Sequence, residues 1–397
     1  MSKNILIVAE CFYPEEFKIN DIALSWKRKG YDVDVLTLVP TYPKGRVFEG
    51  YRNKFFYKDH YNGINIYRVF AVTGYRESLF KKFLRYINFM IIGSIASLFL
   101  SKKYDYVFGF NIGSLTSMFP AVTVSKIKKI PLTLWIQDLW PESVYGYGFK
   151  RIIVVSFLLD RFVRVVYRSA NSIAITSKGF EKKLRFYIGN DMELHYLPNW
   201  PDDLDLTLNP YKFDNQDRVN FTFAGNIGRI QNLENIISAF SSLSEKYLSK
   251  AQLNIIGDGS YLEDLKLMNE CDNIIFHGKK PRKDMGKYYK GSDFLIVSLI
   301  DKPIYSHTVP AKTQTYILAN KPILAIINGE TAEIVRNNNL GYCAKPNDLD
   351  DIREVFMKSI DTSRIVLSKF SKNSKLLLDK KFNKEKIINS LESVLTN

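Results

Sequence analysis

Glycine-containing turns follow several of the apolar strands that the second half of the chain predicts. The turns are Gly225-Asn226-Ile227-Gly228 after residues 220–224, Gly257-Asp258-Gly259 after residues 253–256, and Gly278-Lys279 after residues 273–276. Glycine lets a backbone approach a phosphate closely, and the first amides of a following helix have no partner within that helix. An ordinary tight turn explains each of these alone, but their repetition after successive strands favours one anion-binding site.

A longer loop over residues 298–311 follows the predicted strand 294–298 and leads into a helix that begins near Pro310. Proline at the first turn of a helix loses no hydrogen bond, so the amides after Val309-Pro310-Ala311 can face an anion while Lys312 supplies a full positive charge. The loop also carries polar side chains that could contact a ligand, namely Asp301, Tyr305, His307 and Thr308.

These turns are positioned by strands that alternate with helical patterns in both halves of the chain. The predicted strands are residues 4–9, 31–39, 104–110, 132–136 and 172–176 in the first half, and residues 220–224, 253–256, 273–276, 294–298 and 322–326 in the second. Continuous apolar strands separated by helices predict parallel, doubly wound sheets. Ligands of such sheets bind outside the carboxyl ends of the strands, where the glycine turns fall.

Two α/β domains follow from this alternation. We expect Rossmann-like domains over residues 1–197 and 220–363, separated by a linker at 198–219 that is rich in Pro, Asn and Asp. The lysine-rich tail, residues 364–397, has a helical pattern, and a return to the N-terminal domain is one arrangement open to it. With 397 residues the chain is long enough for two cores.

The net charge of +15 is distributed unevenly along the chain. Residues 1–200 hold 29 Lys and Arg against 16 Asp and Glu, whereas residues 201–397 hold 27 against 25. A basic surface attracts nucleic acid or an anionic membrane, and composition does not choose between them. The three cysteines have neither disulfide nor zinc spacing, and Met1 leads directly into an apolar strand without a secretory signal, so we expect a cytoplasmic protein.

One segment of the basic half, Leu79–Leu100, combines Lys81, Lys82 and Arg85 with aromatic and aliphatic residues. Its stretch without strongly polar side chains other than serine, Ile91–Leu100, is shorter than the ~20 apolar residues that a membrane-spanning helix requires. Packing beneath a sheet and contact with a membrane interface both remain open for this segment.

The ordered set of motifs resembles the GT-B glycosyltransferases of family 4, in the subgroup that transfers sugars during bacterial polysaccharide assembly. The segments that carry the resemblance are Tyr13–Asp21, Pro40–Gly45, Trp135–Ser143, Ala224–Gly228, Ile256–Gly259, Asp293–Leu299, Val309–Lys312 and Lys321-Pro322. The resemblance implies a cleft between two Rossmann-like domains. It also implies retaining, metal-independent transfer of a hexosyl or N-acetylaminosugar group from a nucleotide diphosphate sugar, UDP-linked in our expectation.

The first glycine turn departs from the pattern of that family. Asn226 and Gln231 stand where the family usually has an arginine and a lysine that neutralise the donor diphosphate, so Arg229 and Lys312 become the expected cations. The paired glutamates of the family would fall at His307 and Thr315. We expect Thr315 or Gln314 to contact the ribose, and His307 or Asp301 the sugar. The expected donor-binding residues are Gly225, Asn226, Gly228, Gly257, Asp258, Gly278, Lys279, Tyr305, His307, Val309, Pro310, Ala311, Gln314 and Thr315.

For the N-terminal domain the resemblance implies an acceptor site. Asp138, which follows the strand 132–136, is the expected carboxylate that takes the acceptor proton or stabilises positive charge on the sugar, while a loop-stabilising aspartate is the alternative. Glu142 is a weaker candidate for the same role. The residues expected to line the acceptor entrance or to face the reaction centre are Tyr13, Glu15, Glu16, Tyr42 and Lys44.

No metal or cofactor is expected. Asp32-Val33-Asp34 lies in a predicted strand and Asp203-Leu204-Asp205 in the expected linker, so neither is placed as a metal-binding Asp-x-Asp motif, and the four histidines lack ligand spacing. The acceptor expected from the basic first half is a lipid-diphosphate-linked saccharide at the inner face of the cell membrane, as in capsule, O-antigen or exopolysaccharide synthesis. Two alternatives stay open: a UDP-sugar epimerase or hydrolase of the same fold, and a basic nucleic-acid-binding protein without catalytic activity.

Overall fold

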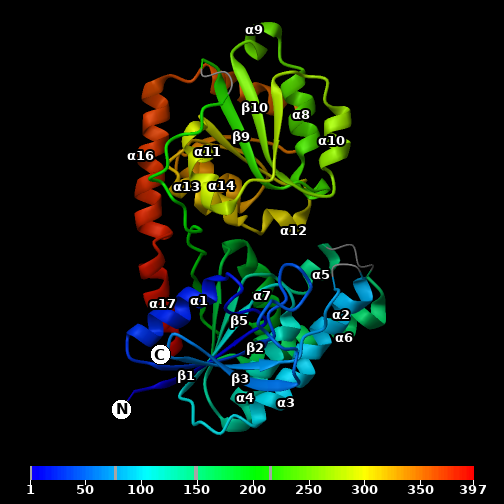
Figure 1. Cartoon of the computed structure of the whole chain (residues 1–397), viewed down its shortest axis with the longest axis vertical. Coiled ribbons are helices and arrows are strands. Elements are labelled where there is room, and N and C mark those ends of the chain that lie inside the picture. The colour runs from blue at the N-terminus through cyan, green and yellow to red at the C-terminus, as the bar shows by residue number, and fades with distance from the viewer. Residues whose placement is uncertain (1, 76–77, 147–150, 214–216) are drawn as a thin grey trace. The chain divides into compact units, whose positions relative to one another are not determined.

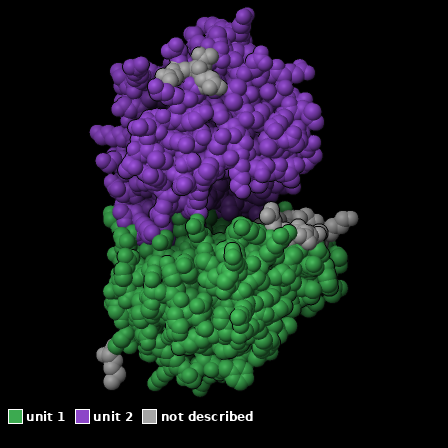
Figure 2. Space-filling view, in the orientation of Figure 1, with its two compact units in different colours: residues 1–197, 385–397 green, residues 198–384 purple. Residues whose placement is uncertain are grey.

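The computed structural model describes residues 2–75, 78–146, 151–213 and 217–397. The chain forms two compact units, which are called unit 1 and unit 2 below (Figures 1 and 2). Unit 1 comprises residues 1–197 and 385–397, and unit 2 comprises residues 198–384. The segment expected to be a linker, 198–219, is therefore part of unit 2. Its Tyr211 N–H donates to the Lys287 carbonyl (2.8 Å), and its Phe213 is buried.

Unit 1 is built on an eight-stranded sheet with the order β3-β4-β2-β1-β5-β6-β7-β8. Its strands are β1 (Asn4–Ala9), β2 (Asp32–Leu38), β3 (Phe56–Tyr61), β4 (Ile64–Val69), β5 (Tyr106–Asn111), β6 (Leu132–Ile136), β7 (Ser172–Ile175) and β8 (Leu194–Tyr196). The aliphatic side chains of β1, β2, β5 and β6 are buried, because helices cover both faces of the sheet.

One strand pair of unit 1 was not predicted: at the edge of the sheet, β3 pairs antiparallel to β4. Asn62 and Gly63 have positive φ values of 46° and 76°, the conformation of a tight hairpin turn. Side chains of β3 alternate between exposed and half-buried, so this strand lacks the continuous apolar run that marked the others.

Helices of unit 1 cover the sheet and carry the segment Leu79–Leu100. They are α1 (Lys18–Arg28), α2 (Leu79–Asn88), α3 (Ser94–Leu98), α4 (Phe119–Lys128), α5 (Glu142–Gly146), α6 (Ile153–Ser169), α7 (Glu181–Ile188) and α17 (Lys384–Thr396), with short turns η1 (Phe89–Gly93), η2 (Leu115–Met118) and η3 (Lys178–Phe180). A π-helical turn, η1, joins α2 to α3. Within the described ranges, no helix is both long enough and apolar enough to cross a membrane.

Unit 2 contains a six-stranded parallel sheet with the order β11-β10-β9-β12-β13-β14. Its strands are β9 (Val219–Asn226), β10 (Ala251–Asp258), β11 (Ile274–Gly278), β12 (Phe294–Ser298), β13 (Ile323–Ile326) and β14 (Gly341–Ala344). Its helices are α8 (Leu233–Ser241), α9 (Glu245–Leu248), α10 (Leu262–Met268), α11 (Met285–Gly291), α12 (Pro303–Ser306), α13 (Ala311–Leu318), α14 (Glu330–Asn337), α15 (Leu349–Ile360) and α16 (Arg364–Lys381), with short turns η4 (Arg229–Gln231) and η5 (Arg282–Asp284).

The tail forms two helices rather than one. The first, α16, belongs to unit 2, and the chain breaks at the buried Phe382 before α17 begins. Most of α17 belongs to unit 1, where Ile388 and Leu391 are buried. The Lys29 ammonium pairs with Glu392, and the Tyr31 hydroxyl donates to the same carboxylate (2.9 Å).

Candidate functional site

The carboxyl ends of β9 and β10 lie side by side in unit 2 and bring two of the glycine turns together. Both strands extend two residues beyond the predicted ends, so Gly225 pairs with Gly257 and Asn226 with Asp258 within the parallel ladder. Gly225 and Gly257 have φ values of 144° and 148°. A Cβ atom on Gly257 would lie 1.8 Å from the Gly225 carbonyl oxygen. Glycine at position 257 is therefore required by the neighbouring strand itself.

The turn after β9 is closed by its own hydrogen bonds. The Ile227 N–H donates to the Asp258 carbonyl (2.9 Å), which ties the turn to the end of β10. The Gly228 N–H donates to Oε1 of Gln231 (2.9 Å). A glutamine at 231, where the resembled family has a lysine, thus holds the backbone of the turn and leaves the cationic role to another residue.

Lys312 brings that positive charge to the end of β9. It lies in the first turn of α13, and its Nζ is 3.8 Å from the centroid of the Phe223 ring. A Cβ atom on Gly225 would lie 3.0 Å from the same Nζ, so the ammonium group contacts the glycine turn directly. Burial lowers the pKa of Lys312 to about 7, and no carboxylate in the described part of the chain offsets this effect. The site thus holds a desolvated cation with no ionic partner among these residues.

Arg229, the other expected cation, has a different environment. Its guanidinium carbon lies 4.4 Å from the centroid of the Tyr261 ring, and one of its nitrogens lies 3.9 Å from Asp264 on α10. The side chain is 76% exposed. The structure therefore brings Lys312 to Gly225 and leaves Arg229 on the surface against α10.

The loop between β12 and α13 is fixed from two sides. The Ile300 N–H donates to the Ile230 carbonyl (3.0 Å) in η4, and the Thr331 hydroxyl donates to the Thr308 carbonyl (3.3 Å) from α14. Gly329 is required before α14, because a Cβ atom there would lie 2.0 Å from the Ser306 carbonyl oxygen. Tyr305 and His307 are half-buried in this loop, and burial raises the pKa of the Tyr305 hydroxyl.

Gln314 and Thr315 are the residues predicted to contact the ribose. Both are buried within α13, and the Thr315 hydroxyl donates to the Ala311 carbonyl of the same helix (3.3 Å). A helix that begins at Ala311 turns these positions toward the core. At the third turn, Gly278 has a φ of 64° at the end of β11, and Lys279 after it is exposed.

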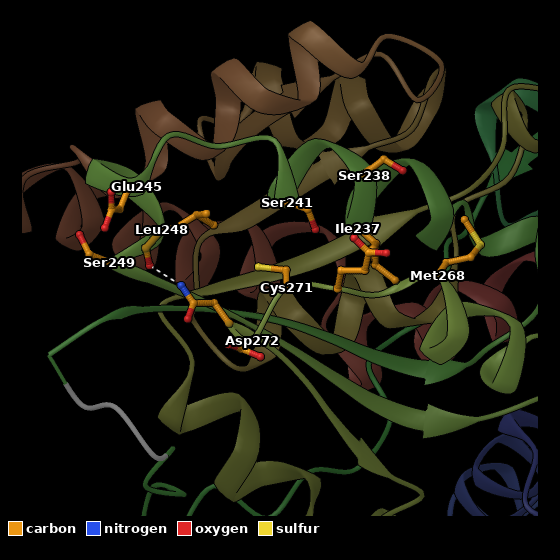
Figure 3. Close-up of a pocket in the computed structure, with 11 residues that line it drawn as sticks. Ile237, Ser238, Ser241, Glu245, Leu248, Ser249, Met268, Cys271 and Asp272 are labelled. Atoms are coloured by element: carbon orange, nitrogen blue, oxygen red, sulfur yellow. Dashed lines mark hydrogen bonds between the residues drawn. The ribbon is translucent and has the colours of Figure 1, made fainter.

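A cavity of about 700 Å³ in unit 2 lies at the opposite edge of the sheet (Figure 3). Ser249 precedes β10 and residues 271–273 precede β11, so the cavity opens at the amino ends of these strands. Figure 3 shows Cys271 between Ser241 on α8 and Asp272. Parallel sheets bind their ligands at the carboxyl ends, and this cavity is separate from the glycine turns.

In unit 1, buried charges gather at the carboxyl ends of β1 and β2. Arg85 of α2 donates from Nε to the Glu10 carboxylate (2.7 Å) and also donates to the Thr41 hydroxyl. The Glu15 carboxylate accepts from the N–H groups of Thr41 (2.8 Å) and Tyr42 (2.6 Å). Burial is the main cause that raises the pKa of Glu15. The sequence offered no signal for Glu10 and Arg85, because 74 residues separate them.

The other expected residues of unit 1 lie around the ends of β5 and β6 or on the loops after β1 and β2. Asp138 accepts from the Gly113 N–H (2.6 Å), and burial raises its pKa. Glu142 pairs with Lys183 (3.3 Å). Tyr13 stacks on Tyr61 with 3.6 Å between ring centroids. Glu16, Tyr42 and Lys44 are exposed.

Residues 210–377 match the family model described as "Glycosyl transferases group 1". The matched residues all lie within unit 2. The probable glycosyltransferase WbjE of Pseudomonas aeruginosa is 25% identical over 249 residues, which cover 57% of this chain and 61% of WbjE. The matches span between 46% and 64% of the curated relatives' own lengths.

Solved structures share the fold of this chain over nearly its whole length. WaaG, a glycosyltransferase involved in lipopolysaccharide biosynthesis, has a TM-score of 0.63 at 13% identity, over 99% of this chain and 100% of WaaG. Anabaena HepE in complex with UDP and glucose has a TM-score of 0.65 at 12% identity, over 99% of both chains. The predicted fold class, GT-B with two Rossmann-like units, is confirmed.

The side chains that could bind a metal ion are dispersed in the described part of the chain. Across residues 2–75, 78–146, 151–213 and 217–397, no group of three or more His, Cys, Asp or Glu side chains is arranged to hold a metal ion. Asp34 lies within β2, where it accepts from the Tyr104 hydroxyl (2.8 Å) and the Asn65 amide (2.8 Å). Asp205 accepts from the Thr207 N–H and hydroxyl (2.9 and 2.6 Å). Both aspartates thus have structural partners.

Proposed function

We propose that this protein is a retaining glycosyltransferase of family 4 that uses a nucleotide diphosphate sugar, UDP-linked, without a metal ion. The observation that carries the proposal is the desolvated Lys312 ammonium against Gly225, at the carboxyl end of a Rossmann-like sheet. A cation without an ionic partner at this position favours an anionic ligand. The group 1 domain and the UDP and glucose bound by HepE support a UDP-sugar as that ligand.

The reaction breaks the bond between the sugar anomeric carbon and the diphosphate oxygen and forms a bond to an acceptor hydroxyl oxygen. The electron pair of the broken bond leaves with the diphosphate, where Lys312 stabilises the negative charge. Attack on the same face from which the diphosphate leaves retains the anomeric configuration. The proton of the acceptor hydroxyl passes to Asp138 or, where Asp138 instead stabilises the positive charge on the sugar, to an oxygen of the departing diphosphate.

We propose a lipid-diphosphate-linked saccharide as the acceptor, at the inner face of the cell membrane. The excess of 13 positive charges in residues 1–200 supports a polyanionic partner of the N-terminal half. The role of WaaG in lipopolysaccharide biosynthesis supports a place in capsule, O-antigen or exopolysaccharide assembly. The sugar that is transferred, a hexose or an N-acetylaminosugar, is set by hydroxyl contacts that a donor panel would identify.

The direct test measures UDP release from a panel of UDP-sugars with and without a bacterial lipid extract, in the presence of EDTA. We expect release from one or a few donors, and only when the extract is present. Release without extract would instead indicate a hydrolase, and conversion of the donor without release an epimerase. Tight, salt-sensitive binding to RNA or DNA without binding of any nucleotide sugar would refute the assignment as a transferase.

A further inference from the structure

The first two turns of α6 expose apolar side chains at almost every position. The exposed fractions are 87% for Ile153, 67% for Val154, 55% for Val155, 62% for Phe157 and 61% for Leu158. Later in the same helix, Val163, Val166 and Tyr167 are buried against unit 1. The C-terminal part of α6 is therefore an ordinary packed helix, whereas its N-terminal part presents aliphatic and aromatic surface to solvent.

Exposure of this kind is costly for a helix in water. A helix with apolar residues on all sides is normally buried in a core or in a membrane, because each exposed side chain orders water around it. Isolated exposed hydrophobic residues are common, but contiguous ones mark an interaction surface. The run Ile153–Leu158 is contiguous along the helix, and its five apolar side chains are each more than half exposed.

A second group of exposed apolar residues lies on α2. Phe80, Phe83 and Leu84 are exposed, and α2 and α6 both contact η2. Figure 1 shows α2 and α6 on the same side of unit 1. We call the exposed side chains of α2 and of residues 153–158 the apolar surface of unit 1.

Basic side chains accompany this surface. Residues 79–100 contain no acidic residue; Lys81 is exposed and Lys82 half-buried there, whereas Arg85 is buried against Glu10 and does not belong to the surface. Residues 151–169 contain four arginines and one acidic residue, Asp160, which accepts from the Tyr187 hydroxyl (2.9 Å). Apolar residues next to Lys and Arg match an interface in which acyl chains lie beneath anionic headgroups.

We propose that the apolar surface of unit 1 binds the interface of an anionic phospholipid bilayer. The choice of a bilayer over a protein partner rests on the charge of the surface and on the proposed function, which requires a lipid-linked acceptor. The first two turns of α6 extend about 10 Å at 1.5 Å per residue, which is too short to cross a hydrocarbon core of about 30 Å. The contact holds the protein at the membrane as a peripheral protein.

Co-sedimentation with vesicles tests the proposal. We expect the full chain to bind vesicles of phosphatidylcholine with about one third phosphatidylglycerol, and to bind pure phosphatidylcholine much more weakly. The double variant Ile153→Ser/Phe157→Ser should bind the anionic vesicles at least about tenfold more weakly, because it loses two apolar contacts. The double variant Lys81→Gln/Lys82→Gln should bind on the order of 30-fold more weakly, and raised salt should abolish the difference.

Leu267→Ser is the matched control. Leu267 is 85% exposed on α10 of unit 2, nearly as much as Ile153, and the change should leave vesicle binding unaltered. Equal vesicle binding by the wild-type protein and Ile153→Ser/Phe157→Ser would overturn the proposal. So would a dimer in sedimentation velocity that this variant dissociates, since a second copy would then cover the surface.

Different results refute the proposed function and the proposed membrane contact. UDP-sugar binding, measured by thermal shift, should be the same in Ile153→Ser/Phe157→Ser and in the wild-type protein, because unit 2 carries the donor site. Vesicle binding without binding of any UDP-sugar would support the membrane contact and refute the transferase assignment. UDP-sugar binding without vesicle binding would leave the transferase assignment in place and overturn the membrane contact.

Discussion

Replacement of Lys312 by methionine should weaken donor binding and at the same time stabilise the free protein. The ammonium group lies against Phe223 and Gly225 without a carboxylate partner among the described residues, so its charge is costly until a diphosphate arrives. Methionine has a similar length and no charge, and it should pack against Phe223. A lysine that served only to stabilise the fold would show loss of stability on the same change.

The size of both effects follows from the pKa of about 7. If the ammonium were fully buried, this pKa would correspond to a loss of folding stability of roughly 5 kcal/mol relative to an ordinary lysine. The Lys312 side chain is half-buried, and contact with solvent reduces the loss to about 1–3 kcal/mol. The unfolded chain binds this proton up to a higher pH than the folded protein does, so the wild-type protein gains stability as the pH rises from about 7 toward 10.5. Loss of a charge-assisted contact to the diphosphate should weaken binding by about 1.5–3 kcal/mol, or roughly 10- to 150-fold.

Isothermal titration with the UDP-sugar that the donor panel selects, between pH 6 and 9, measures the affinity. The diphosphate of a UDP-sugar keeps its charge over this range, so affinity for the wild-type protein should fall by up to about tenfold per pH unit above pH 7. The Lys312→Met variant should show weak binding with little pH dependence, together with a higher melting temperature near pH 7 that approaches the wild-type value at higher pH. Arg229→Met, which removes a surface cation, should bind nearly as well as the wild-type protein. Unchanged affinity in Lys312→Met, or the same pH dependence in both proteins, would refute the reasoning.

Three further changes test other parts of the site. Gly257→Ala should lower the free energy of unfolding by about 3 kcal/mol or more, because its Cβ would overlap the carbonyl of the neighbouring strand, whereas Gly278→Ala, with open space around its Cβ, should cost about 1 kcal/mol in urea titrations. Asp138→Asn should lower kcat by about 10²- to 10⁴-fold with little change in donor affinity, and the wild-type rate should fall as the pH drops through the raised pKa of Asp138; an unaltered kcat would leave it a loop-stabilising residue. Arg85→Met should cost about 3–5 kcal/mol of stability because Glu10 stays buried without its ionic partner, and a second change, Glu10→Gln, should restore part of the loss; no recovery would mean that the pair is not the cause.

Local patterns were enough to predict most of the sheet and the position of the glycine turns. The strands β6 and β12 begin and end where the apolar runs do, because both faces of a central parallel strand are covered. The ends of β9 and β10 were placed two residues too early, since glycine usually ends a strand. Here Gly225 and Gly257 continue the ladder, and the absence of a Cβ at Gly257 leaves room for the Gly225 carbonyl.

Side-chain partners could not be predicted from local patterns. Arg229 and Lys312 were both predicted to bind the diphosphate because both are cations near the first glycine turn. Arg229 instead packs its guanidinium over Tyr261, whereas Lys312 contacts Gly225. Gln314 and Thr315 are polar and close to Lys312 in sequence, yet the rotation of α13 buries both. The exposure of the first two turns of α6 could not be predicted either, because an apolar helical run normally indicates a core helix.

Because α17 packs on unit 1, the chain passes between the units twice, near residues 197–198 and 384–385. A single proteolytic cut at the first crossing would leave both pieces covalently joined through the second. A fragment that ends at residue 197 would lack the helix that buries Ile388 and Leu391 and would expose the surface it covers. For recombinant work, unit 1 is therefore a discontinuous domain, best produced with residues 385–397 supplied as a separate peptide or fused by a flexible linker.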